Sequence, residues 1–425
     1  MHATRTTNPA IRAAINFFDL LTVDYRKRDF LVRFWDGTEW SRSQSPRFRL
    51  TLNHPSSLKR IFTDPSELGL GEAYISGDFE MEGDLDAAFD FGDFLVNHHF
   101  SIPAKLKLAA FRAQLPGTRQ KTSPMARLEG AVHSRGRDRS AIAFHYDVSN
   151  DFYKLWLDKS MVYSCAYFQS TEMGIEEAQA SKLDYICRKL RLKRGDQLLD
   201  IGCGWGGLII HAVKNFGVRA FGITLSTPQA EYVREQTRFE GIADRCNVEV
   251  CDYRDLDPPQ EYDKIVSIGM FEHVGTTLLP AYFRHAWEML RPGGVFLNHG
   301  IAASATYGRS GPSFIDRYVF PDGELVPINL ALKVAEETGF EVRDLENLRE
   351  HYALTLRQWV RRLDSNANMA RALVGELRYR IWRLYMAGSA YAFSKGRLGL
   401  HQLLLIKPDH GKSNLPLTRT DWYVS

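Results

Sequence analysis

The residues with the clearest chemical meaning form a glycine-dense turn between an apolar strand and a helix. The strand, Leu198 to Ile201, contains Asp200, and glycines follow at positions 202, 204, 206 and 207 before an apolar helix that starts at Leu208. Closely spaced glycines let the backbone turn sharply and approach a ligand. The free N–H groups of the following helix would face that ligand. A tight turn without a ligand is the alternative, but it does not need this many glycines.

Two cofactors are compatible with such a loop. Gly202, Gly204 and Gly207 match the G-x-G-x-x-G pattern of dinucleotide sites, in which an acidic residue follows about 20 residues later. The corresponding position here is Thr224, and no carboxylate stands nearby. With Asp200 inside the strand and glycines alternating at 202, 204 and 206, the loop instead resembles class I S-adenosylmethionine (SAM) methyltransferases. SAM is therefore the expected cofactor.

The composition is typical of a globular protein with more than one domain. The chain has 425 residues, of which 44% are hydrophobic and 25% charged, and a net charge of +3, too small to indicate nucleic-acid binding. Five cysteines without C-x-x-C spacing predict neither a disulfide framework nor a metal site. The first residues lack a signal-peptide core, and no apolar run is long enough to span a bilayer, so we expect a cytoplasmic protein with only peripheral membrane contact.

Residues 1–115 are predicted to form a small α+β domain. The pattern indicates a helix over 1–29, a hairpin at Asp36-Gly37, a strand over 47–52 and two short helices. The acidic segment 77–93 is interpreted as a solvated face. Residues 116–140 are basic and lack a hydrophobic period, which predicts a linker, either disordered or in contact with anionic lipid headgroups.

Strands and helices alternate through the predicted second domain, residues 141–425. Strands are expected at 197–201, 219–223, 247–251, 264–268 and 294–299, with helices at 207–216, 227–241, 278–291 and 327–338. This alternation predicts an α/β fold with a parallel, doubly wound, Rossmann-like sheet, and ligands bind such sheets where the strands end. Insertions near 302–326 and 350–395 are long enough to cover a pocket. A final strand is expected at 401–406.

Six segments in order carry a closer resemblance: His145–Asn150, Tyr163–Tyr167, Leu199–Gly206, Gly222–Ser226 with Gln229, Ser267–Gly275 and Tyr318–Gly323. They resemble bacterial cyclopropane-fatty-acyl-phospholipid synthases and, from about residue 135 onward, mycolic acid cyclopropane synthases. The resemblance implies that a cis double bond of an acyl chain in membrane phospholipid attacks the SAM methyl. A base then removes a proton from the added methyl, and the ring closes. Because an alkene is a weak nucleophile and water would trap the carbocation, the site must be well ordered and dry.

The resemblance also implies the catalytic residues. In the family the base is a bound bicarbonate, which Glu272 and His299 would hold through their side chains. Tyr352 would donate its hydroxyl, and Cys165 and Ile301 would contribute backbone. The alternatives are a buried small apolar residue for Cys165 and a satisfied core histidine for His299. The sequence around Tyr352 departs somewhat from the family's sequence pattern.

The SAM contacts carried over from the resemblance fall into three groups. Asp200, Gly202, Gly204 and Gly206 would face the methionine part, with Tyr163 and Ser164 closing over it. Thr224 and Gln229 would reach the ribose. Asp252, Tyr253 and Arg254 would flank the adenine, although Cys-Asp-Tyr-Arg equally suits a plain strand end.

Other hypotheses concern the product and the partners. The same carbocation could lose a different proton and give a methylene or methyl branch, and a non-catalytic lipid-binding protein is the third possibility. The Arg- and aromatic-rich insertion suits an acyl-chain entrance beneath anionic headgroups, or a helix packed on the sheet. Its residues are Arg357, Trp359, Arg361, Arg362, Arg378, Tyr379, Arg380, Trp382, Arg383 and Tyr385. We expect a homodimer at the inner membrane, without a metal or a nucleic-acid partner.

Overall fold

The computed structural model describes residues 8–115, 134–138, 149–256, 262–304, 313–321 and 323–423. Contacts divide the chain into two compact units. The first unit comprises Met1–Met125, Gly311–Val319 and Gly375–Tyr391, and the second comprises Ala126–Ser310, Phe320–Val374 and Ala392–Ser425. Parts of both insertions therefore group with the first unit, which differs from the predicted assignment. The linker over 116–140 stays a prediction, because most of it lies outside the described residues.

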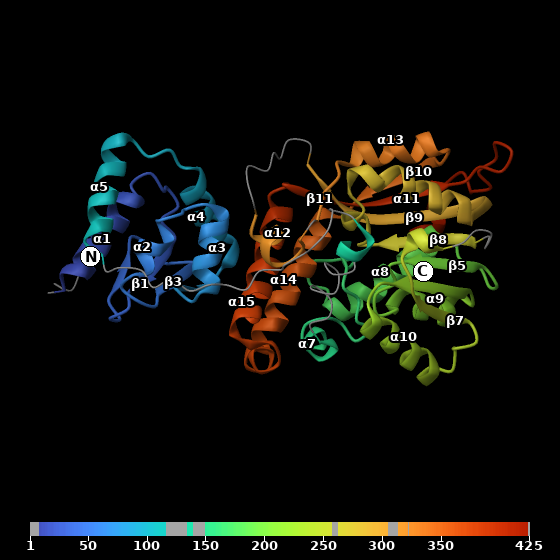
Figure 1. Ribbon diagram of the computed structural model, residues 1–425, viewed down its shortest axis with the longest axis horizontal. Coiled ribbons are helices and arrows are strands. Elements are labelled where there is room, and N and C mark those ends of the chain that lie inside the picture. Colours follow the sequence, from blue (N-terminus) through green and yellow to red (C-terminus); the bar gives the residue numbers. More distant parts are fainter. Residues whose placement is uncertain are drawn as a thin grey trace. The chain divides into compact units, whose positions relative to one another are not determined.

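The first unit is an α+β structure around a four-stranded sheet (Figure 1). The strands are β1 (Phe30–Arg33), β2 (Glu39–Ser41), β3 (Phe48–Leu52) and β4 (Phe79–Gly83), in the order β2-β1-β3-β4. The helices are α1 (Pro9–Leu21), α2 (Ser57–Ile61), α3 (Glu67–Ile75), α4 (Leu85–Asn97) and α5 (Ile102–Ala113). The hairpin at Asp36-Gly37 is confirmed, since β1 pairs antiparallel with β2. The predicted helix over 1–29 is too long, because α1 ends at Leu21.

The interpretation of segment 77–93 as only a solvated face is wrong. The segment forms β4 and the first half of α4. Asp78 is buried and pairs with Arg60 at 3.1 Å. Asp84 is the N-cap of α4, where its Oδ1 accepts the N–H of Ala87 at 3.1 Å, and its Oδ2 pairs with Arg47 at 2.5 Å. Such N-cap carboxylates satisfy helix N–H groups that otherwise lack partners. Asp78 and Asp84 thus make specific contacts within this unit.

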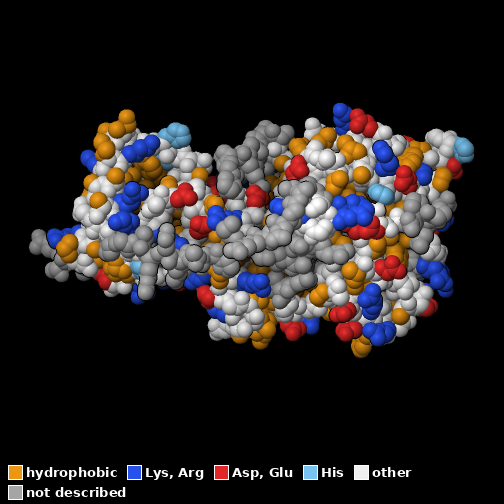
Figure 2. Space-filling view, viewed as in Figure 1, with side chains coloured by type: hydrophobic (Ala, Val, Ile, Leu, Met, Phe, Trp, Pro, Cys, Tyr) orange, Lys and Arg blue, Asp and Glu red, His pale blue; other side chains and the backbone are white. Residues whose placement is uncertain are grey.

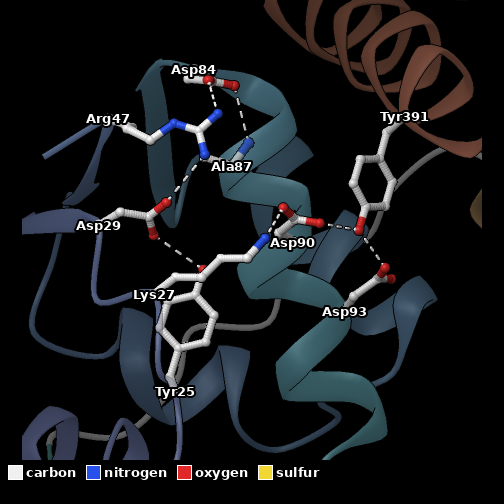
Figure 3. A network of polar contacts seen from close by, with 9 residues as sticks. All are labelled: Tyr25, Lys27, Asp29, Arg47, Asp84, Ala87, Asp90, Asp93 and Tyr391. Atoms are coloured by element: carbon white, nitrogen blue, oxygen red, sulfur yellow. Dashed lines mark hydrogen bonds and ion pairs between the residues drawn. The ribbon is translucent and has the colours of Figure 1, made fainter. Parts of the chain in front are cut away.

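Helix α15 (Ala367–Ser394) is shared between the two units. It breaks at Gly375, where φ is 79° and ψ is 162°, and residues 375–391 belong to the first unit. There the hydroxyl oxygen of the buried Tyr391 lies 2.8 Å from Oδ1 of Asp90 and 2.5 Å from Oδ2 of Asp93, both on α4, so its one proton is shared between the two carboxylates (Figure 3). Arg380 forms an ion pair with Glu80 in the same unit. Part of the Arg-rich insertion therefore serves packing inside the first unit.

The second unit contains a seven-stranded sheet in the order β10-β11-β9-β8-β5-β6-β7. The strands are β5 (Gln197–Ile201), β6 (Arg219–Thr224), β7 (Cys246–Val250), β8 (Tyr262–Ile268), β9 (Leu290–Ala303), β10 (Glu341–Asn347) and β11 (Leu398–Ile406). The predicted parallel sheet is confirmed from β9 to β7. Strand β11 runs antiparallel to both of its neighbours, so the whole sheet is mixed. Strand β10, which is polar and largely half-buried, was not predicted.

Apolar cores cover both faces of this sheet. Leu198 belongs to one core and its neighbour Leu199 to the other, because successive strand residues point to opposite faces. The first core includes side chains of α8 (Ile175–Lys189), α9 (Gly207–Phe216) and α10 (Thr227–Phe239). The second includes α11 (Gly275–Met289) and α13 (Ile328–Thr338). This is the expected doubly wound arrangement. Among the described helices, none has the length and hydrophobicity that crossing a bilayer requires.

Other described helices include four that lie outside the two cores' main layers. They are α7 (Asn150–Lys154), α12 (Phe314–Tyr318), α14 (Arg349–Ser365) and α16 (Thr420–Tyr423). Helices α14 and α15 confirm that the insertion near 350–395 is helical. Figure 2 shows basic and acidic side chains interspersed over the visible face of the second unit, in keeping with the small net charge.

Candidate active site

The glycine-rich loop joins β5 to α9, as predicted. Gly202, Gly204 and Gly206 have φ angles of +89°, +55° and +80°. Side chains are disfavoured in this region of backbone conformation. At Gly206, a Cβ atom would also lie 2.8 Å from Cγ2 of Val233. Only glycine allows this turn at the end of β5 with the first N–H groups of α9 exposed to a ligand.

A buried acid and a buried base face the same pocket beside this loop. Burial raises the pKa of Asp200 to about 7, although nearby Lys182 opposes the shift. Burial likewise lowers the pKa of Lys182 to about 8. The Oδ1 atom of Asp200 has no hydrogen-bond partner among the described residues. An unsatisfied buried polar atom costs about 1–3 kcal/mol, so this oxygen is suited to accept a hydrogen bond from a ligand.

The aromatic segment after Met161 is held in place by α8. Gln179 donates from Nε2 to the carbonyls of Val162 at 3.2 Å and Ser164 at 2.8 Å. Lys182 donates from Nζ to Oγ of Ser164 at 2.9 Å. The adjacent ring of Tyr163 lies 5.3 Å from that of Trp359. Tyr163 and Ser164 are thus positioned at the pocket by the protein itself, which reduces the ordering cost of binding.

Helix α14 holds the other end of the same segment. The N–H of Ala166 donates to Oγ1 of Thr355 at 3.0 Å, and the N–H of Phe168 donates to Nδ1 of His351 at 2.9 Å. Cys165 lies between them and is buried, with Sγ 3.8 Å from the carbonyl oxygen of Leu348. Burial raises the pKa of the Cys165 thiol, so the group is a neutral thiol.

The residues expected at the ribose and adenine form two polar pairs. Thr224 donates from Oγ1 to Oε1 of Gln229 at 2.7 Å. Arg254 binds both carboxylate oxygens of Asp252, at 2.8 and 2.6 Å. Between them in sequence, the hydroxyl of Tyr253 is buried without a hydrogen-bond partner among the described residues. That hydroxyl and the amide of Gln229 could satisfy polar atoms of a nucleoside.

One pocket collects most of the residues predicted to bind SAM. Its lining includes Tyr163, Ser164, Asp200, Gly202, Gly204, Thr224, Gln229, Asp252, Tyr253 and Arg254. Gly206 is outside the lining and acts through the turn described above. These residues fit SAM. The unpartnered Oδ1 of Asp200 suits the methionine part, the glycine loop lets the ligand approach the backbone, and the two polar pairs suit the nucleoside.

The predicted catalytic residues lie on two adjacent segments: Glu272 in the 3-10 helix η2 (Phe271–His273) that follows β8, and His299 and Ile301 on β9. The N–H of Ile301 donates to Oε1 of Glu272 at 2.6 Å. His299 lies two residues before Ile301 on β9, so both side chains are on the same face of the sheet. Residues Ile268 to Met270 and His273, on either side of Glu272, line the SAM pocket. These three residues therefore lie beside the expected cofactor.

Two polar atoms in this group have no hydrogen-bond partner among the described residues: Oε2 of Glu272 and Nε2 of His299. Burial raises the pKa of Glu272 to about 7 and lowers the pKa of His299 well below its usual value. A carboxyl that holds a proton near neutrality can donate a hydrogen bond to an anion, which an ionised carboxylate cannot do. The donor set therefore fits a small oxyanion such as bicarbonate.

Tyr352 and Cys165 form a separate group. Tyr352 is buried on α14, its ring centroid 4.8 Å from that of Phe393. Its N–H donates to the carbonyl of Leu348, which is also the carbonyl near Cys165. Both residues are thus linked to each other through Leu348. Their roles at the oxyanion stay predictions.

Four buried polar residues near the site were not predicted from the sequence: Gln179, Lys182, Lys189 and Gln402. The first three lie on the inward face of α8 with Leu183 and Ile186. A detectable signal existed, because positions 179, 182, 186 and 189 recur at helical spacing and three of them are polar. Buried polar side chains at such positions indicate specific partners.

Comparison with known proteins agrees with this geometry. The mixed sheet, the glycine loop and the pocket define a class I SAM-dependent methyltransferase, and coclaurine N-methyltransferase, at 22% identity, shares the fold with a TM-score of 0.57. The chain belongs to the family described as mycolic acid cyclopropane synthetase, whose model matches residues 133–403. Residues 19–91 match a second family, described as a domain of unknown function, DUF7884.

Three similar proteins show how far the likeness extends. A probable fatty acid methyltransferase of Pseudomonas putida is 42% identical over 397 residues, covering 92% of this chain and 95% of the relative. The cyclopropane-fatty-acyl-phospholipid synthase of Escherichia coli is 36% identical over 317 residues, covering 74% and 76%. The solved mycolic acid cyclopropane synthase CmaA1, complexed with SAH and CTAB, is 35% identical with a TM-score of 0.60, covering 63% of this chain and 97% of its own.

Proposed function

We propose that this protein transfers the methyl group of SAM to a cis double bond in an acyl chain of membrane phospholipid and closes a cyclopropane ring. The observation that carries the proposal is the pair of buried atoms, Oε2 of Glu272 and Nε2 of His299, which lack partners among the described residues. In support, Glu272 lies in the sequence between Met270 and His273, which line the SAM pocket, and the carbonyl of His299 accepts the N–H of Gly269, another lining residue, at 2.9 Å. Methyl transfer to a heteroatom would not need a separate oxyanion site for proton removal.

The protein's part in the first step is to orient the reactants and exclude water. SAM supplies an electrophilic methyl group when it is bound. Tyr163 and Ser164, held from α8 and α14, would close over its methionine part, and Asp200 would accept a hydrogen bond from it. Alignment of this kind can supply about 7–11 kcal/mol of the barrier reduction. Trp359 and Phe393 add apolar surface around Tyr352, as a carbocation site requires.

The protein's part in the second step is to hold a base where the proton is lost. Glu272 in its protonated form and the Nε2–H group of His299 would donate to bicarbonate, which would supply the base. His299 stays neutral because burial keeps its pKa low, so the site does not carry a fixed positive charge next to the reacting carbon. Tyr352 and the backbone near Cys165 and Ile301 would complete the site.

A second product follows from the same steps. The relative from Pseudomonas putida, which covers 92% of this chain, is named a probable fatty acid methyltransferase. Loss of a proton from a neighbouring chain carbon, in place of the added methyl, would leave a methyl-branched unsaturated chain. A 1,2-hydride shift that moves the charge to the methyl-bearing carbon, followed by loss of a proton from that methyl, would leave a methylene branch. Both products need the same cofactor and the same lipid. We further propose a homodimer that works in the cytoplasm at the surface of the inner membrane.

The deciding experiment is incubation with SAM and vesicles of cis-monounsaturated phospholipid, followed by mass spectrometry of the released fatty acids. A gain of one CH2 unit with loss of the double bond would support ring formation. The same gain with unsaturation retained would support the branched product. SAM binding without any gain, by protein that is folded and mixed with fluid vesicles, would contradict both.

A further inference from the structure

A row of polar side chains crosses the sheet and ends at His299. Strand pairing places Glu346 of β10 opposite Gln402 of β11, and Gln402 opposite His299 of β9. Directly paired residues project from the same face of a sheet. That face is covered by α8, whose Lys189 reaches the row. The row thus runs from β10 to the predicted catalytic histidine.

The orientation of the Gln402 amide follows from its neighbour on one side. The Nζ atom of Lys189 lies 3.0 Å from Oε1 of Gln402. A lysine ammonium group can only donate hydrogen bonds, so the atom facing it must be the amide oxygen. The amide nitrogen consequently faces His299, where it lies 3.2 Å from Nδ1.

The tautomer of His299 follows from the same contact. An amide nitrogen can only donate, so Nδ1 must accept the hydrogen bond and cannot carry a proton. In a neutral imidazole the proton is then on Nε2, the atom that is buried without a partner among the described residues. His299 therefore presents an N–H donor at that position.

Lys189 is itself fixed from the far side. Its Nζ atom lies 2.6 Å from Oε2 of Glu346 and 3.2 Å from Oδ2 of Asp344. Tyr185 also donates to Oε2 of Glu346, at 2.9 Å. Lys189 is completely buried, so these contacts hold the ammonium in one place and leave it a fixed donor to Gln402. A continuous chain of hydrogen bonds therefore runs from Glu346 through Lys189 and Gln402 to His299.

We propose that Gln402, oriented by Lys189, is a positioning residue that fixes His299 in the Nε2–H tautomer and directs this N–H toward the oxyanion. The catalytic consequence rests on the proposed function of His299. The tautomer itself does not, because it follows from contacts within the protein. Without Gln402, either ring nitrogen could carry the proton, and a share of the molecules would present a lone pair to an anion.

The tautomer can be read without turnover, from long-range proton–nitrogen correlation spectra of the full-length protein labelled with nitrogen-15 histidine. The chain has 13 histidines, so His299 is assigned by its absence in His299→Gln. We expect a protonated Nε2 in the wild type. A protonated Nδ1 in the wild type would overturn the proposal, whether or not any variant folds.

Two variants test how the tautomer is set. Gln402→Glu replaces the amide donor with a group that accepts, so the proton should move to Nδ1. Lys189→Met should leave a mixture of tautomers, because the amide is free to turn. The matched control is Gln358→Glu, which alters a half-buried amide that donates to the carbonyl of Met173 at 2.8 Å. It should leave the His299 signals unchanged. Retention of Nε2–H in Gln402→Glu would contradict the proposal.

Kinetics with SAM and phospholipid vesicles then test the consequence. For Gln402→Glu we expect kcat to fall at least about tenfold, with KM for SAM within about twofold of the wild type. A kcat within twofold of the wild type would overturn the positioning role. If the wild type does not methylate the vesicles, the proposed function fails while the spectra still decide the tautomer.

Discussion

The N–H of Ile301 on β9 donates at 2.6 Å to Oε1 of Glu272, which lies in the 3-10 helix η2 just after the parallel neighbour β8. This contact occupies one carboxyl oxygen and leaves the other, Oε2, buried without a partner among the described residues. It therefore fixes which oxygen can meet a ligand. Substitution of Glu272 can therefore test whether its free oxygen, Oε2, takes part in the reaction.

Glu272→Gln should separate chemistry from cofactor binding. The amide can still accept the N–H of Ile301 and donate to an anion, but it cannot pass a proton to or from bound bicarbonate, so we expect kcat to fall by roughly 10²–10⁴-fold. The dissociation constant for SAM, measured by calorimetry, should change little because Glu272 is outside the lining of the SAM pocket. A collapse of SAM affinity would show that Glu272 belongs to the SAM site and not to a separate oxyanion site.

Asp200→Asn should weaken SAM binding, in contrast to Glu272→Gln, which should lower kcat. Replacing the orphan carboxylate oxygen removes a charged acceptor for the ligand, so SAM affinity should fall by about 10- to 100-fold. The matched control is Asp263→Asn, at the other end of the same strand pair, where Oδ2 accepts the N–H of Gln197 at 2.8 Å. The control should bind SAM normally, and an equal loss in both variants would mean that the effect is structural.

Glu272 should also make stability depend on pH. Its pKa is about 7 in the folded protein against an ordinary value of 4.5, so between these values the folded state holds a proton that the unfolded state has released. The free energy of unfolding should therefore fall as pH rises through this window, by up to about 1.4 kcal/mol per pH unit.

The comparison that isolates this effect is wild type against Glu272→Gln, by urea unfolding between about pH 5 and pH 8. Asp200, whose pKa is also about 7, titrates in both proteins and cancels from the difference. The stability advantage of the wild type over the variant should shrink as pH rises and then level off. A difference that does not vary with pH would show that Glu272 titrates normally.

Tyr391→Phe should destabilise the first unit. The hydroxyl shares its one proton between the carboxylates of Asp90 and Asp93 (Figure 3), so its loss leaves two neighbouring negative charges without a common donor. We expect the free energy of unfolding to fall by about 1–3 kcal/mol, which calorimetry would record as a lower melting temperature. Tyr423→Phe is the control, because Tyr423 is 63% exposed. Equal melting temperatures for wild type and Tyr391→Phe would show that this network does not contribute.

The sequence was most informative where local pattern decides structure. Strand 197–201 and helix 207–216 were predicted with the bounds that the structure has, because an apolar run, a glycine turn and a helical period follow directly on one another. Most of the expected SAM residues lie in one pocket because the carboxyl ends of parallel strands share one edge of the sheet.

Other features depend on contacts between distant segments, which no local pattern records. Strand β10 is polar and largely half-buried, so it resembles a loop until β11 pairs with it. In the sequence, Lys182 and Gln402 cannot be told from surface polar residues. Only the fold shows that they are buried, with Lys182 bonded to Ser164 and Gln402 in contact with His299. The same is true of Tyr391, whose partners lie about 300 positions earlier in the chain.

The break in α15 at Gly375 has a consequence for dissecting the protein. Because residues 375–391 group with the first unit, no single peptide cleavage divides the chain into two self-sufficient halves. Severing it between residues 115 and 134 would leave Tyr391 and Arg380 on one fragment and Asp90, Asp93 and Glu80 on the other. Each fragment would lack part of a folded module, and co-expression should restore it by complementation.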